Sequence, residues 1–348
     1  MARLMFGLCY AGYGCAGSRY PFSIRITPLA IEKISMSLED RARTRERIQA
    51  IAKELGYHPS SVAQQLRSGR TGTIALASSM PFAVAAGPSR LGFLMEIAAS
   101  AAMAAFSRDI ALCLIPPQPS QTNLNQMGFD GVILVEPERD DPLVRHFESR
   151  RTPVVTIGKV PDRGDIPAID LQSAAGMRLL LGHLWENGAR QIALLTGASE
   201  RTSHLEARRI YEEFAQTHGL PSRLLLLDEA KGEDGAKEVV KKLLRDCPKI
   251  DGLLVPVDAF ASGAIAAARE VEKSIPEELI IATRYDGLRA KLSVPPLTAL
   301  DLHLSELAEA AVTLLLAHIE GVPAAPTTSI PSLVPRRSSM AVGDRREM

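Results

Sequence analysis

Short apolar runs alternate with helical patterns between residues 73 and 320, and this alternation constrains the fold more than any other feature of the sequence. Each apolar run is four to six residues long, the usual length of a strand. The runs cover residues 73–78, 110–115, 131–135, 153–157, 191–196, 223–227, 252–255 and 280–283. Between them, apolar side chains recur at the i, i+3, i+4 spacing of one helix face. These helical segments cover residues 91–107, 173–187, 205–218, 235–245, 261–273 and 304–320.

Strands separated by helices form βαβ units, whose parallel sheets are buried on both faces. Eight strands of this kind are too many for one ordinary sheet, so we expect two doubly wound sheets with a cleft between them. The predicted fold class is α/β, with a two-lobed core over residues 71–340 and a tail over residues 341–348.

The composition is that of a soluble globular protein. Of the 348 residues, 46% are hydrophobic and 23% are charged, and the length allows two or three domains. No run of about 18 or more apolar residues occurs, so we expect no membrane span. The four cysteines (Cys9, Cys15, Cys113 and Cys247) form no CxxC pair, which fits a reducing cytosol and argues against a zinc site.

A short helical pattern precedes the core. Residues 45–57 repeat apolar side chains at helical spacing, and Pro59 then interrupts the helix because the residue before a proline disfavours helical geometry. Ser60 or Ser61 can cap a new helix, which Gly69 ends after less than three turns. Isolated helices shorter than about 12–15 residues are marginal in water, so this helix should form only when it docks on another molecule.

Positive charge is concentrated before the core. Residues 1–70 contain eleven Lys or Arg and five Asp or Glu, a net charge of +6. Because the formal net charge of the whole chain is zero, the remaining residues carry −6. A basic head on an acidic body fits binding of nucleic acid by the head.

A resemblance to a known family supports this interpretation. Residues 44–76, with the sequence TRERIQAIAKELGYHPSSVAQQLRSGRTGTIAL, resemble the join between the DNA-binding head and the effector core of LacI-type transcriptional regulators. In that family the short helix is a hinge that orders on operator DNA, and its leucine, matched here by Leu66, wedges into the minor groove from each of two subunits. The resemblance implies a hinge helix over residues 59–70, a homodimer and operator DNA as a partner. The residues it assigns to DNA binding are Tyr57, Ser60, Ala63, Leu66, Arg67 and Arg70.

Residues 1–43 depart from the family's pattern. They contain nothing that resembles its helix-turn-helix, and residues 4–28 are rich in glycine and aromatic residues without a helical period. Either the head is divergent, or roughly the first 30 residues result from a frameshift or a wrong start. We favour the second explanation. We assign residues 1–58 to a small, atypical α-helical head and name no recognition helix, so base contacts are not assigned.

The core resembles a periplasmic-binding-protein type I fold. Four phrases typical of the family recur in order: GFDGVILVEP, NGARQIALLTG, IDGLLVPVDAFASGAI and VPPLTALDLHLSELAEAAVTLLLAHIEG. The resemblance implies that a small-molecule effector, a sugar or a sugar-like compound, binds in the cleft between the lobes.

Ligands of doubly wound sheets bind at the carboxyl ends of the strands. The candidate effector-binding residues are Ser79, Arg208, Asp258 and Asp286. The family's contacts transfer incompletely, because Val257 replaces the asparagine of its Asn-Asp pair and Ala207 replaces its arginine, with Arg208 next to it. Each lost partner leaves a ligand group unpaired at a cost of about 1–3 kcal/mol, so we expect the effector to be recognised in an unusual way.

Three functions compete. The first is a cytoplasmic, ligand-responsive DNA-binding regulator, acting as a repressor. The alternative is an exported periplasmic sugar-binding receptor with the same core, but glycines break the apolar start of the chain and receptors lack a hinge helix. An enzyme has no motif behind it, because the seven histidines lack metal spacing and no Gly-x-Ser-x-Gly occurs. We therefore expect no catalytic residue, no metal and no cofactor.

Overall fold

The computed structural model describes residues 38–55, 69–85, 92–116 and 121–340 of the chain. The chain divides into two compact units, residues 1–64 and 65–348. The described part of the first unit is helix α1 (Leu38–Glu54), which confirms the helix predicted there and begins seven residues earlier. Its apolar residues Ile48 and Ile51, with Leu55 after it, are exposed. No helix among the described residues is both long enough and apolar enough to cross a bilayer.

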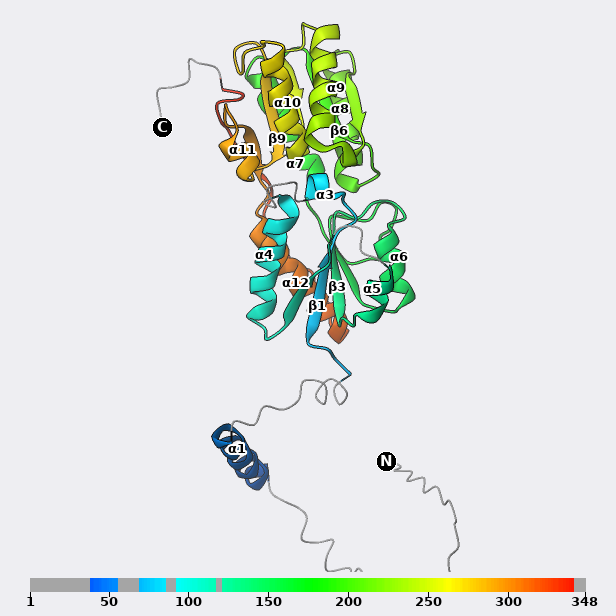
Figure 1. Ribbon diagram of the computed structural model, residues 1–348, viewed down its shortest axis with the longest axis vertical. Coiled ribbons are helices and arrows are strands. Elements are labelled where there is room, and N and C mark those ends of the chain that lie inside the picture. Colours follow the sequence, from blue (N-terminus) through cyan, green and yellow to red (C-terminus); the bar gives the residue numbers. More distant parts are fainter. Residues whose placement is uncertain (1–37, 56–68, 86–91, 117–120, 341–348) are drawn as a thin grey trace, which may run out of the picture. The chain divides into compact units, whose positions relative to one another are not determined.

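The second unit contains two lobes, each built on one sheet (Figure 1). The sheet of the N-terminal lobe has the strand order β2-β1-β3-β4-β5, and all its strands are parallel. Its strands are β1 (Thr73–Ala77), β2 (Ala111–Leu114), β3 (Gly131–Val135), β4 (Val154–Ile157) and β5 (Ala168–Ile169). Its helices are α3 (Phe82–Ala85), α4 (Phe93–Phe106), α5 (Gln121–Gln126), α6 (Pro142–Ser149) and α12 (Leu304–Glu320). The central strand β3 is buried along its whole length, as a parallel strand covered on both faces should be.

The sheet of the C-terminal lobe has the order β11-β10-β9-β8-β6-β7. It contains β6 (Ile192–Gly197), β7 (Leu224–Leu227), β8 (Gly252–Leu254), β9 (Ile280–Tyr285), β10 (Thr298–Asp301) and β11 (Ser332–Val334). Only β11 among these described strands runs antiparallel to its neighbour. Its helices are α7 (Ser173–Glu186), α8 (Thr202–Thr217), the 3-10 turn η2 (Glu229–Lys231), α9 (Gly232–Asp246), α10 (Asp258–Glu270) and α11 (Leu288–Leu292).

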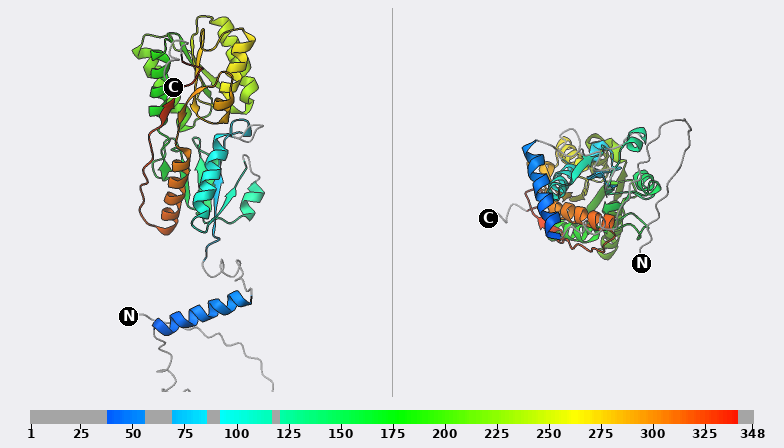
Figure 2. Two further views of the ribbon diagram at one scale, coloured as in Figure 1. Left: turned by 90° about the vertical axis from the view of Figure 1, so that its left-hand side faces the viewer. Right: turned by 90° about the horizontal axis from the view of Figure 1, so that it is seen from below.

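The chain passes between the lobes more than once. After β5 it enters the C-terminal lobe at α7, and after β10 it returns to the N-terminal lobe, where α12 packs on α4 (Figure 2). It then leaves α12 and adds β11 to the sheet of the C-terminal lobe. The chain therefore crosses between the lobes three times, which is the arrangement of a two-lobed binding core.

The predicted α/β fold with two doubly wound lobes is confirmed. Each of the eight predicted strands and six predicted core helices has a counterpart. The sequence missed β5, which has two residues, and also β10 and β11, which pair with each other across more than thirty residues of chain. It also missed the short helices α3, α5, α6 and α11. Helix α6 begins after Asp141, whose carboxylate accepts a hydrogen bond from the Leu143 N–H.

Candidate functional site

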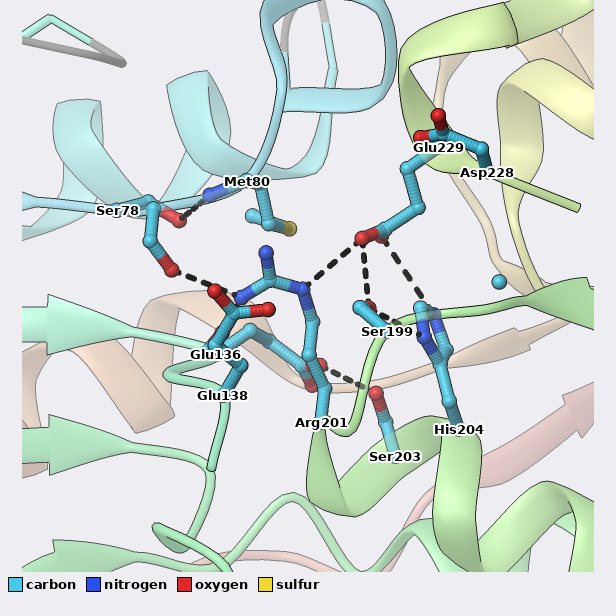
Figure 3. Close-up of polar contacts among 12 residues, drawn as sticks. Ser78, Met80, Glu136, Glu138, Ser199, Arg201, Ser203, His204, Asp228 and Glu229 are labelled. Carbon is cyan, nitrogen blue, oxygen red and sulfur yellow. Dashed lines mark hydrogen bonds and ion pairs between the residues drawn. The ribbon is translucent and has the colours of Figure 1, made fainter. Parts of the chain in front are cut away.

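The carboxyl ends of strands from both sheets face each other between the lobes. From the N-terminal lobe come Ser79, which follows β1, and Glu136, which follows β3. From the C-terminal lobe come Arg201, which follows β6, and Arg284, near the end of β9. This convergence is the position where doubly wound sheets bind ligands. Figure 3 shows the polar contacts at its centre.

Glu136 is the acidic centre of the N-terminal side. Glu136 is only 4% exposed. Its backbone has a left-handed φ of 51°, a conformation that costs a non-glycine residue about 1–3 kcal/mol. The carboxylate accepts hydrogen bonds from the Ser203 hydroxyl and, at 3.2 Å, from Nη2 of Arg284. Burial would raise the pKa of Glu136, but Arg284, the Ser203 hydrogen bond, His204 and Arg201 outweigh it and hold the pKa below its ordinary value.

Arg201 belongs to the C-terminal lobe but bonds to both lobes. It is 1% exposed, and its Nε lies 3.2 Å from Oε2 of Glu229 in its own lobe. Its Nη1 donates to Ser79 Oγ at 3.1 Å and to the backbone carbonyl of Glu136, both in the N-terminal lobe. Ser79 in turn donates to Asp141 at 2.5 Å. One buried guanidinium therefore connects the two sheets.

Glu229 and His204 complete this cluster on the C-terminal side. The Ser199 hydroxyl donates to Oε2 of Glu229 at 2.7 Å and lies 3.1 Å from Nδ1 of His204. Nε2 of His204 is 3.7 Å from Oε1 of Glu229. Burial lowers the pKa of His204 below its ordinary value and outweighs the opposing effect of Glu229 and Glu136, so the imidazole is neutral at pH 7.

Further contacts cross between the lobes at the edge of the cluster. The Arg139 N–H donates to the carbonyl of Glu200 at 3.0 Å, and their side chains pair at 2.7 Å. The Thr202 hydroxyl donates to the carbonyl of Lys159 at 2.6 Å. The Tyr285 hydroxyl donates to the carboxylate of Glu96 on α4. The lobes are thus in a closed arrangement.

A small cavity of about 40 Å³ remains between the lobes. Its lining combines apolar side chains with charged ones: Met80, Val84, Phe93, Glu136, Ser203, His204, Glu229, Pro256, Val257, Asp258, Arg284 and Tyr285. Asp258 is 8% exposed, and burial raises its pKa against the opposing charge of Arg289, whose Nε lies 3.8 Å away. The cavity has room for one or a few water molecules, each of which needs about 10–15 Å³.

The structure does not bring the four predicted effector residues together. Asp258 lines the cavity, whereas Ser79 is not among the lining residues: its hydroxyl donates to Asp141 and accepts from Arg201. Arg208 donates to the carbonyls of Gly197 and Ser199 at 2.6 and 3.0 Å, so it supports the loop after β6. Asp286 pairs with Arg336 and, at 3.6 Å, with Lys291, away from the cavity lining. Of the four, Asp258 alone lines the cavity, and direct effector contact stays a prediction for all of them.

Sequence reasoning missed Glu136 and Glu229. A signal for Glu136 was present, because a glutamate directly after a fully buried apolar strand must lie at the carboxyl edge of the sheet. Glu229 lies two residues after β7 and carried no comparable signal. Among the described residues, no group of three or more His, Cys, Asp or Glu could hold a metal ion.

Most of the predicted DNA-binding residues lie outside the described residues, namely Tyr57, Ser60, Ala63, Leu66 and Arg67. Arg70 is described. Its Nη1 lies 3.9 Å from Oε1 of Glu320, and both side chains are more than half exposed. Such an exposed pair contributes little to stability, typically about 0–1 kcal/mol.

Two lobes whose strand ends enclose a buried polar cavity define the class of the protein, a two-lobed α/β binding core. A family model described as a periplasmic binding protein-like domain matches residues 181–339. A ribose operon repressor of Halalkalibacterium halodurans is 30% identical over 285 residues, which cover 79% of this chain and 81% of that protein. The HTH-type transcriptional regulator CelR of Thermobifida fusca is 25% identical over 74% of this chain and 78% of its own length.

Solved structures share the same fold. The lac repressor dimer bound to operator and the anti-inducer ONPF matches with a TM-score of 0.71 at 23% sequence identity, over 86% of this chain and 91% of that one. A complex of the regulator CelR with cellobiose matches with a TM-score of 0.67 at 23% identity, over 89% and 94% of the two chains. From these relatives, the chain belongs to the LacI family of transcriptional regulators. The curated relatives named above are transcriptional regulators by name.

Proposed function

We propose that this chain is a cytoplasmic, homodimeric repressor that binds operator DNA through residues 59–70 and responds to a small molecule in the cleft between its lobes. One observation carries the proposal: the carboxyl edges of both sheets meet around a buried cavity. The core that contains this cavity directly follows residues 59–70, which resemble the family's hinge. The relatives support a regulator over an exported receptor, because they are operon repressors and HTH-type regulators by name.

The small molecule is proposed to be a sugar or a sugar-like compound. The relatives include a ribose operon repressor and a regulator solved with cellobiose. In the cleft, Asp258 offers a buried carboxyl group and Ser79 a hydroxyl. Phe93 and Tyr285 are edge-to-face with ring centroids 5.6 Å apart and supply apolar surface for a sugar ring. Arg208 acts indirectly, by holding the loop after β6 that carries Ser199 and Arg201, and Asp286 acts through its pair with Arg336 next to Tyr285.

Large apolar side chains that are exposed on the single chain support its association into a dimer. Met103 and Phe106 on α4 are 71% and 78% exposed, and Leu292 and Val294 at the end of α11 are 75% and 70% exposed. Leu292 and Val294 border a groove of about 420 Å³ between α10 and α11. Exposed apolar patches of this kind mark sites of protein association, and the matched lac repressor structure is a dimer.

A gel shift of the full chain on the DNA beside its own gene tests the proposal. We expect a shift at low salt that weakens steeply as salt rises, because phosphate contacts release counterions. Leu66→Ala should weaken binding at least about tenfold, because the wedge between base steps is lost. Leu226→Ala is the matched control, since Leu226 is half exposed on β7 in the C-terminal lobe. A folded dimer that shifts no fragment at low salt, or Leu66→Ala binding like the control, contradicts the proposal.

A further inference from the structure

Side chains of the chain itself fill the centre of the cleft. Arg201 reaches from the C-terminal lobe to Ser79 and to the Glu136 carbonyl, and Arg284 reaches from the same lobe to the Glu136 carboxylate. These are the strand-end positions at which a ligand of two doubly wound sheets would lie. No ligand is needed to pair these groups, because each buried charge already has a partner in the other lobe or beside it.

Separation of the lobes breaks the Arg284–Glu136 ion pair and the hydrogen bonds that Arg201 donates to the N-terminal lobe. Glu136 is in the N-terminal lobe, and both cations that face it, Arg201 and Arg284, are in the C-terminal lobe. A buried charge that loses its partner is strongly unfavourable, so the network favours the closed arrangement until water can enter. The titratable groups that face Glu136 and Arg201 also include Glu229, His204, Glu138 and, beyond Arg284, Asp258. Of these only Glu138 belongs to the N-terminal lobe.

The remaining space is too small for a sugar. The cavity measures about 40 Å³, whereas a cavity that accommodates a molecule as small as benzene measures roughly 150 Å³. A ring with several hydroxyl groups cannot bind beside Arg201 in this arrangement. Either the network opens first, or the ligand does not enter.

We infer that Arg201 is a built-in ligand of the cleft: with Glu136 it holds the lobes closed in the absence of any small molecule. A sugar-sized effector enters only after the contacts of Arg201 and Arg284 with Glu136 break, so the network opposes its binding. The statement about the effector rests on the proposed function. The statement about closure concerns the ligand-free chain alone and does not depend on DNA binding.

Backbone hydrogen exchange of the ligand-free full chain, resolved to single amides, tests closure. The Arg139 amide reports on it because this N–H donates across the cleft to Glu200 at 3.0 Å. The Val132 amide is the internal reference, because it donates to Pro153 within the N-terminal lobe at 2.9 Å. We expect both amides to be protected in the wild-type chain, since exchange requires the hydrogen bond to open. Exchange of wild-type Arg139 at the rate of an unprotected amide overturns the inference.

Two variants then distinguish loss of the contacts between the lobes from a general loss of stability. Arg201→Ala should speed exchange at Arg139 by at least about tenfold and leave Val132 unchanged, because only the contact between the lobes is lost. Arg163→Ala is the control: it removes an arginine that pairs with two carboxylates, Glu148 and Asp165, and all three residues lie within the N-terminal lobe. Arg201, by contrast, pairs with the carboxylate of Glu229 and donates hydrogen bonds across the cleft. Arg163→Ala should leave Arg139 as protected as in the wild type. Equal protection of Arg139 in Arg201→Ala and the wild type overturns the inference.

Arg201→Lys provides the second variant if removal of the side chain unfolds a lobe. Lysine keeps the charge but lacks the forked guanidinium that reaches Glu229, Ser79 and the Glu136 carbonyl together. Exchange at Arg139 should then rise by a smaller factor while Val132 stays protected. Unchanged Arg139 exchange in this variant overturns the inference. Because no DNA is present, failure of the gel shift leaves these outcomes intact.

Discussion

Gln172 and His303 occupy equivalent positions at two crossings between the lobes. Gln172 precedes α7 with φ 49°, and His303 precedes α12 with φ 52°, so both adopt the left-handed conformation. In each case the backbone N–H donates at 2.8 Å to the carboxylate of an aspartate two residues earlier, Asp170 or Asp301. The sequences Asp-Leu-Gln and Asp-Leu-His thus form the same turn where the chain changes lobe.

This turn predicts opposite effects of glycine at His303, which precedes α12, and at His318, within α12. His303→Gly should raise the free energy of unfolding by up to about 1 kcal/mol, because glycine adopts the left-handed conformation without a steric cost. His318→Gly, in the last turn of α12, should lower it by about 0.5–1 kcal/mol, because glycine disfavours the helix. Urea denaturation of both variants measures the difference. Destabilisation by His303→Gly equal to that by His318→Gly would show that the turn carries no strain.

The buried Glu136 carboxylate predicts a specific loss of stability in acid. Its pKa is lowered in the folded chain from an ordinary value of 4.5, so its contribution is present above pH 4.5 and is lost as the pH falls through the folded pKa. At pH 7, Glu136→Gln should lower the free energy of unfolding by roughly 3–5 kcal/mol, because Arg284 keeps its charge without a partner. Below pH 4.5 the variant should lose less further stability than the wild type does.

Urea denaturation of both proteins between pH 3 and pH 7 checks this prediction. The control is Asp165→Asn, which also removes a carboxylate paired with an arginine, Arg163. The pKa of Asp165 is lowered to about 2, chiefly by its hydrogen bond with Arg163, but the group is exposed and water screens the pair. Its effect at pH 7 should be much smaller than that of Glu136→Gln. Parallel pH curves for the wild type and Glu136→Gln would sink the assignment of acid sensitivity to Glu136.

The fold followed from local sequence, whereas the arrangement of the cleft did not. A run such as 131–135 is apolar at every position, so burial on both faces is readable from the residues alone. By contrast, β5 has two residues, and β11 exists because it pairs with β10 more than thirty residues earlier in the chain. Neither strand carries its own signal in the sequence.

The candidate site shows the same limit. Asp258 was predicted because it follows a strand, and the structure places it in the cavity lining. Asp286 follows a strand too, but Arg336, fifty residues later, takes up its carboxylate. Arg201 and Glu136 meet only because the lobes face each other, and no spacing in the sequence encodes that contact. Position at the end of a strand predicted which residues could lie near the cleft. The hydrogen-bond and ion-pair partners of each side chain then decide whether it lines the cavity.

The exposed apolar side chains of α4 and α11 predict an interface between two copies of the chain. Both helices lie along one edge of the core, at the left of Figure 1. Leu292→Asp should shift the chain toward monomer by at least about tenfold in dissociation constant, because a charge would be buried without a partner. Leu226→Asp, half exposed on β7, should leave association unchanged. Sedimentation velocity over a concentration series compares them, and equal behaviour of the two variants would remove α11 from the interface.

Arg70 is predicted to contact DNA, and its ion pair with Glu320 supplies a control for that prediction. Arg70→Ala should weaken binding to the DNA fragment and reduce the slope of log affinity against log salt by about 1, because one phosphate contact is lost. Glu320→Ala breaks the same 3.9 Å pair but keeps the arginine charge, so it should bind DNA at least as well as the wild type. Both partners are more than half exposed, so neither change should shift the melting temperature by more than a few degrees. Salt titrations of the two variants by fluorescence anisotropy separate the alternatives: equal slopes for Arg70→Ala and the wild type would place Arg70 away from the DNA.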